Sequence, residues 1–320
     1  GGIYLNVDSY GLPASIMKNV IIRYGGATSS GKGLGYPIKL TGRTQPTIEN
    51  VQLENNRRNA IGLDNGSYTS DLRLNVVGVP YYLETQDLVV NAGVKMTIDP
   101  GVIIKFDLTY NTFNYKGADI IINGQLIANG TGDQPIYMTS AKDDSIGGDS
   151  NADGSSVPAV GDWGGIVLNS SSSNSSIKNL SISYAGSNNQ GSDSAILITN
   201  ASPLIENVEF RNNDDDIFVY GTGNPDLGGG ALGSLGGNKF YDHTVGSGNW
   251  AVYNDSTNNI FAYNNVWNYS TTAQIDGIIR DKKDDGTKGE VFYVAYEVCG
   301  DLIVWSGHEQ CDDGNVVNGD

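Results

Sequence analysis

PTIENVQLENN at residues 46–56 returns, with few changes, as PLIENVEFRNN at residues 203–213. Upstream of it, GGIYLN at 1–6 and SIMKNVIIRYGGATSS at 15–30 return as GGIVLN at 164–169 and SSIKNLSISYAGSNNQ at 175–190. The offset between the copies shrinks from 163 to 160 to 157 residues, as short loop deletions would produce. Two long copies, 1–78 and 164–235, each built from short apolar runs, indicate repeated units stacked along one axis.

Many of the apolar runs alternate apolar and polar residues with period two, which is the pattern of a strand with one buried face. Asn pairs such as Asn55-Asn56 and Asn212-Asn213 follow the runs, and Asn suits tight bends of the chain. No segment shows a sustained helical pattern, so we expect almost no helix. Examples of the predicted strands are Ile16–Tyr24, Thr47–Glu54, Asp87–Val90, Lys95–Ile98, Val102–Phe106, Ile120–Ile122, Gln125–Ala128, Ile136–Thr139, Ile166–Leu168, Leu180–Tyr184, Ile196–Thr199, Leu204–Phe210 and Ile260–Tyr263.

The composition narrows the function classes. The chain has 320 residues with 19 basic and 36 acidic side chains, a net charge of −17, which argues against a nucleic-acid partner. The sequence contains no apolar stretch of 18 residues, so it predicts no membrane span. The two cysteines, Cys299 and Cys311, fit an oxidising compartment. Because GGI opens the chain in mid-pattern, we expect a further Trp-containing turn to precede it, as Gly161–Trp163 precedes the second copy.

Several stretches resemble the right-handed parallel β-helix of bacterial extracellular and surface proteins, the fold of the pectate lyases. They are residues 79–106, 120–140, 161–168, 238–242, 250–268 and 275–294. The resemblance implies an all-β, single-stranded parallel β-helix (a solenoid) over residues 1–296, with projecting loops. It implies little about activity, because this fold carries enzymes, adhesins and inert stalks alike.

The long insertion KDDSIGGDSNADGSS, residues 142–156, carries Asp149, Asn151 and Asp153 at every second position, followed by Gly154. Oxygen ligands at this spacing before a glycine form the first half of a calcium loop. Val160 stands where an EF-hand has its bidentate Glu, so the loop is not an EF-hand. Further candidate ligands are Asp143, Asp144 and Asp162. The alternative is a solvated polar loop.

The tail CGDLIVWSGHEQCDDGNVVNGD, residues 299–320, resembles a Cys-rich CGDG…CDDGN…GDGC repeat of large secreted bacterial proteins, with Leu302 and His308 departing from the pattern. The resemblance implies a truncated Cys-rich module over residues 297–320. It also implies a second calcium site, with Asp312, Asp313, Asn315 and Asp320 as candidate ligands.

Asp214-Asp215-Asp216 is the one acidic run that an enzyme of this fold could use, because inverting glycosidases need paired carboxylates. The same place in the first copy reads Arg57-Arg58-Asn59, and His243 stands in a loop-like context where we expect it not to complete a site. We therefore predict an acidic turn and no catalytic residues.

Together these features predict a non-enzymatic structural or adhesive segment of a large secreted or cell-surface protein: a stalk, a matrix component or a filament unit stabilised by Ca²⁺. The expected partners are other copies of the chain, neighbouring modules of the same polypeptide, or surface glycans. The alternatives are a polysaccharide lyase or hydrolase and a carbohydrate-binding module. An enzyme would line a groove with carboxylates and cations, whereas a binding module would expose a row of aromatic rings.

Overall fold

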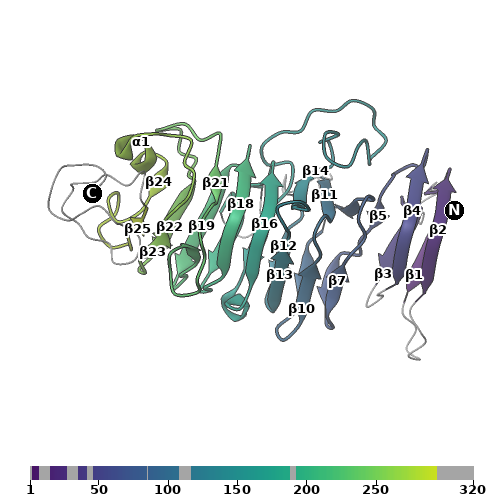
Figure 1. Ribbon diagram of the computed structural model, residues 1–320, viewed down its shortest axis with the longest axis horizontal. Helices are drawn as coiled ribbons and strands as arrows, with labels where there is room; N and C mark the ends of the chain where they lie inside the picture. The colour runs from purple at the N-terminus through teal and green to yellow at the C-terminus, as the bar shows by residue number, and fades with distance from the viewer. Residues whose placement is uncertain are drawn as a thin grey trace, which may run out of the picture.

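The computed structural model describes residues 2–6, 15–26, 35–41, 46–84, 86–107, 117–187 and 192–293. Over this part the chain is nearly all β, with a single short α-helix, α1 (Thr272–Asp276), and one 3₁₀ turn at Ser170–Ser172. Every strand pair is parallel (Figure 1), and the strands lie side by side along the longest axis of the molecule. The all-β expectation is confirmed, and the arrangement is compatible with a β-helix-like solenoid.

The strands form three sheets. The largest, of 15 strands, has the order β1 (Ile3–Asn6), β3 (Ile38–Thr41), β5 (Ile61–Gly62), β8 (Tyr81–Glu84), β11 (Ile103–Asp107), β14 (Ile136–Ser140), β16 (Ser176–Ser183), β18 (Leu204–Arg211), β20 (Asp226–Gly228), β23 (Ile260–Ala262) and β25 (Val291–Phe292). Joined to it are β7 (Leu72–Leu74), β10 (Lys95–Ile98), β13 (Gln125–Asn129) and β21 (Lys239–Phe240).

The second sheet, of eight strands, has the order β24 (Ile279–Arg280), β22 (Val252–Ser256), β19 (Asp215–Gly221), β17 (Ser194–Thr199), β15 (Ile166–Leu168), β12 (Ile120–Ile122), β9 (Leu88–Val90) and β6 (Gly66–Tyr68). The third sheet pairs β2 (Ile16–Arg23) with β4 (Thr47–Glu54). The chain therefore passes repeatedly from one sheet to another, and each strand pairs with one some 20 to 50 residues away.

The core consists of columns in which equivalent apolar side chains lie on one another. The strand register aligns one column in the eight-stranded sheet, and each of its residues is at most 2% exposed: Leu88, Ile120, Ile166, Ile196, Ile217, Val252 and Ile279. Full burial of such a side chain stabilises the fold by roughly 1.5–3 kcal/mol. Period-two alternation in the sequence thus becomes a continuous dry core.

Asparagines turn the chain at the bends within the long strands. Asn19, Asn50, Asn179 and Asn207 all have positive φ, which Asn tolerates better than most residues. Their side chains also bond along the stack: Asn50 Nδ2 donates to Asn19 Oδ1 over 2.7 Å, and Asn207 Nδ2 donates to Asn179 Oδ1. These positions are structural, as the recurrence of Asn after apolar runs indicates.

The two sequence copies share their local pairing. β2 pairs with β4 as β16 pairs with β18, and both pairs carry the same ion pair, Lys18–Glu49 at 2.9 Å and Lys178–Glu206 at 3.0 Å. Their further neighbours differ, because β1 joins the 15-stranded sheet while its counterpart β15 joins the eight-stranded one. The copies therefore do not hold equivalent places in the sheets.

Most predicted strands coincide with observed ones, and Thr47–Glu54 and Ile120–Ile122 match to the residue. The predicted Leu180–Tyr184 is longer, Ser176–Ser183, since the bend at Asn179 does not end the strand. β22 escaped prediction because it is polar. Its buried Asn254 donates to the carbonyl oxygens of Asn258 and Gly289, so a polar side chain fills a core position.

Trp163 closes the core where the long insertion returns to the sheets. Its ring lies on that of Phe106, with centroids 3.9 Å apart and planes at 6°, and its Nε1 donates to the carbonyl of Ser183 over 2.8 Å. We predict that Trp163→Ala lowers the free energy of unfolding by about 3–5 kcal/mol, because it leaves a cavity in a packed column. Urea denaturation measures the change. Val157→Ala, at a side chain 82% exposed, is the control and should change stability by less than about 0.5 kcal/mol. Equal effects of the two substitutions would contradict this packing.

Candidate calcium site

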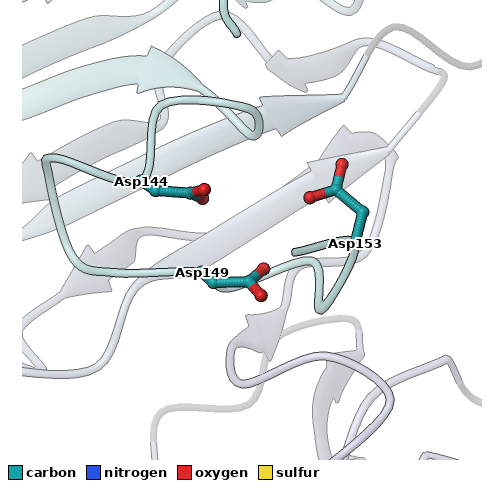
Figure 2. A group of neighbouring side chains, drawn as sticks. All are labelled: Asp144, Asp149 and Asp153. Carbon is teal, nitrogen blue, oxygen red and sulfur yellow. The ribbon is translucent and has the colours of Figure 1, made fainter. Parts of the chain in front are cut away.

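The insertion between β14 and β15 forms an acidic loop, residues 142–160, that brings three carboxylates together. Asp144, Asp149 and Asp153 each offer an oxygen within 4.8 Å of the others. Figure 2 shows the three side chains converging from different parts of the loop. Hard cations such as Ca²⁺ prefer several oxygen ligands of this kind. Two of the three, Asp149 and Asp153, belong to the alternating motif.

A buried lysine supports the loop from below. Lys105 of β11 is fully buried, and its Nζ donates to the carbonyl oxygens of Asp143 over 2.8 Å and Gly148 over 2.6 Å. Burial lowers the pKa of Lys105, and the nearby loop carboxylates, including Asp144 and Asp149, oppose this shift. The ammonium therefore holds the main chain of the loop and offsets part of its negative charge.

Backbone contacts fix the loop to an earlier part of the chain. Asn59 N donates to the carbonyl of Ser150 over 2.8 Å. Gly147 has φ +70°, and a side chain there would meet the ring of Pro80. A glycine is needed at this close approach for both reasons. The loop is thus positioned by residues some 70 to 90 places upstream of it.

Two of the three remaining candidate ligands of the loop, Asp143 and Asp162, have structural partners instead. Asp143 accepts hydrogen bonds from the hydroxyls of Thr139 (2.7 Å) and Ser145 (2.5 Å). Asp162 accepts from the Ser140 hydroxyl and from Lys142 Nζ, each over 2.7 Å. Both are buried, and neither belongs to the cluster of three. The structure therefore separates these residues into anchors of the loop base and a carboxylate group above it.

Asn151 lies beside the cluster. Its Nδ2 donates to Asp153 Oδ2 over 2.9 Å, while its own Oδ1 is buried. Neither this oxygen nor the buried Oδ1 of Asp144 has a hydrogen-bond partner within the described residues. Buried acceptors without donors are costly, so these two oxygens fit a bound cation better than they fit the loop alone.

Lys105 is the site residue that the sequence analysis missed. It interrupts the apolar run VIIKF, residues 102–106, between the buried Ile104 and Phe106, and that interruption is the signal that could have revealed it. The candidate ligands of the tail, Asp312, Asp313, Asn315 and Asp320, lie outside the described residues, as do Cys299 and Cys311.

A second polar cluster lies at the start of β19. His243, although it stands in a loop, meets the acidic run: its Nε2 lies 2.6 Å from Asp216 Oδ2, and both side chains are buried. Burial, followed by repulsion from Asp214, raises the pKa of Asp215 to about 7. β21 ends shortly before His243, and β18 ends shortly before the acidic run. Because β21 pairs with β18, the segments that follow the two strands lie close together.

Comparisons with known proteins identify no relative: no protein-family model, no curated protein and no solved structure matches this chain. The site must therefore be interpreted from its own geometry.

We predict that Lys105→Met lowers the free energy of unfolding by about 2 kcal/mol or more, since it removes the donor to two carbonyls, one of them in the buried Asp143. It should also speed proteolytic cleavage within residues 142–160, because the loop loses its support. Lys95→Met, at an exposed position of the neighbouring strand β10, is the matched control. A Lys105 variant as stable and as resistant to cleavage as the control would show that the ammonium does not hold the loop.

Proposed function

We propose that this chain is a right-handed parallel β-helix that serves as a rigid structural or adhesive segment of a secreted or cell-surface protein. The observation that carries the proposal is the unbroken parallel register through the eight-stranded sheet, from β6 to β24. Strands joined this way by crossovers almost always wind right-handed. A stack of this kind is long and stiff (Figure 1), which suits a spacer or a filament unit and its neighbouring modules.

Calcium is the cofactor of this proposal. The cluster Asp144–Asp149–Asp153 and the two unpartnered oxygens nearby support it. The insertion has few apolar side chains, so an ion would supply the cohesion that a core supplies elsewhere. Binding to the folded loop alone would raise stability with ion concentration. In this proposal the candidate ligands of the tail bind a second Ca²⁺ ion.

The runner-up is a polysaccharide-active enzyme, and one observation favours it: Asp215, with its pKa raised to about 7, lies near Asp214 and His243. Perturbed carboxylates beside a histidine are typical of catalytic sites. We place the enzyme second because His243 and Asp216 are bonded to each other inside the fold, with side chains only 4% and 1% exposed.

Within the described residues, no helix is long and apolar enough to cross a membrane.

Calcium should raise the midpoint temperature of unfolding and slow cleavage within residues 142–160, relative to the same protein with a chelator. Asp153→Asn should weaken the effect at least about tenfold in ion concentration, because it removes one charged ligand. Asp133→Asn, with the same charge change in an exposed turn, is the control. Calorimetric titration gives the binding constant directly. If calcium and chelator give the same melting and cleavage for the parent chain, the loop is only polar and the cofactor proposal fails.

Incubation with polygalacturonate and related acidic polysaccharides should give no products, because the Asp214–Asp216 run and His243 serve the fold in our proposal. Reducing-end and unsaturated-product assays measure hydrolysis and elimination respectively. Turnover that Asp215→Ala abolishes, while Asp133→Asn leaves it intact, would establish the enzyme instead.

A further inference from the structure

His243 fastens an otherwise polar segment to the sheets. The segment, here the strap, is residues 242–250 between β21 and β22, and its side chains from Thr244 to Gly248 are exposed. Gly246 and Gly248 have positive φ, so the chain turns sharply there with little packing to hold it. The strap is therefore kept in place at its two ends.

Both ends of the strap bond to the acidic run at the start of β19. At one end, His243 Nε2 meets Asp216 Oδ2 at 2.6 Å, and Tyr269 Oη donates to the His243 carbonyl over 2.9 Å. At the other end, the main-chain N–H of Trp250 donates to Asp215 Oδ1 over 2.7 Å. Two neighbouring carboxylates thus hold the first and last turns of one loop.

The charged form of His243 is the one that closes the strap. Asp216 also accepts from Asn213 Nδ2 over 3.0 Å, so its carboxylate is already well bonded and faces the imidazole as an acceptor. A hydrogen bond with the main chain of Asn249 favours the charged ring as well. Facing an ionised Asp216, the ring binds Asp216 and Asn249 together only as the imidazolium, which donates from both nitrogens.

The titratable groups around the imidazole are acidic or neutral. From the β19 side come Asp214, Asp215 and Asp216, with Asp193 beside Asp214, and from the strap itself comes Asp242. Tyr269 faces it from the segment before α1. Negative charge from all these directions favours the proton on His243.

We propose that the strap is a proton-dependent clasp, closed when His243 is charged and loosened as the pH rises above neutral. The proposal is independent of the calcium site and of the proposed structural role.

The sign follows from two groups. Burial acts to lower the pKa of His243, but Asp216 and Asp215 outweigh it and the pKa is raised; burial raises the pKa of Asp215 to about 7. A group whose pKa is raised in the closed form stabilises that form in acid and loses this contribution as the pH rises through the raised value. Both groups therefore act in the same direction, and the strap should be tightest at mildly acidic pH.

Hydrogen exchange of the full chain, read by mass spectrometry on peptides covering residues 242–250, tests this. Corrected for intrinsic exchange, protection of the strap should fall about tenfold for each unit by which the folded pKa of His243 exceeds its free value, between about pH 5.5 and about pH 9. A peptide covering β12 serves as the internal reference and should not change. Thr244→Ala, at an exposed position of the same strap, should keep the wild-type dependence.

His243→Gln keeps a donor but cannot take the charge, so its strap should be weakly protected at every pH. Asp215→Asn should weaken the dependence without abolishing it, because it removes the titration of Asp215 and its support for the charged His243 but leaves Asp216 in place. Equal strap protection of the parent chain at both pH values would overturn the proposal, as would a His243→Gln chain with undiminished pH dependence. Should that variant fail to fold, titration of the His243 ring by NMR in a His308→Gln chain decides: a pKa at or below about 6.5 refutes the clasp.

Discussion

The constraint on which the rest of this structure depends is that each inward side chain must lie on its counterpart in the neighbouring strands. In the eight-stranded sheet a single column runs from Leu88 to Ile279 without a polar interruption. Such stacking needs parallel strands in strict register, since a shift of one residue would turn every apolar side chain outward. The Asn bends, the Lys–Glu ladders and the stacked rings of Phe106 and Trp163 all preserve that register.

The candidate functional groups lie in the segments between strands, which the strand register does not constrain. The acidic loop and the strap are both insertions between strands, and both are short of apolar side chains. Each is held by a buried charge instead: Lys105 beneath the acidic loop and the Asp216–His243 pair beneath the strap. Buried charges are expensive unless paired and bonded, which is why both of these are fully engaged. In this way polar loops become ordered parts of the molecule.

Each strand named from the sequence coincides with an observed one, because a two-residue period survives any change in loop length, whereas very short strands such as β5 and β24 were not named. The sequence also indicated Asp149 and Asp153 as one group, and their carboxylates do lie together, because spacing within one loop is local. It failed where position depends on distant contacts. Asp143 and Asp162 share the loop with the cluster yet bond to Thr139 and Ser140 at its base. His243 contacts Asp216, which is 27 residues away in the sequence, and no local sequence pattern predicts this contact. The different sheets of β1 and β15 likewise follow from neighbours that the matching sequences do not specify.

The most direct test of the proposed β-helix is a set of distances measured along one column of stacked residues. Arg73, Ser176, Leu204 and Phe261 occupy successive outward positions of the strands that pair through β7, β10, β13, β16, β18, β20 and β23. In a background with Cys299 and Cys311 replaced by Ser, pairs of spin labels can be placed at Arg73 and at each of the others. With neighbouring strands about 4.8 Å apart, the backbone separations should be about 14, 19 and 29 Å, because three, four and six strand spacings are crossed. Distances that do not rise in these proportions would contradict the stacked parallel register and, with it, the proposed β-helix.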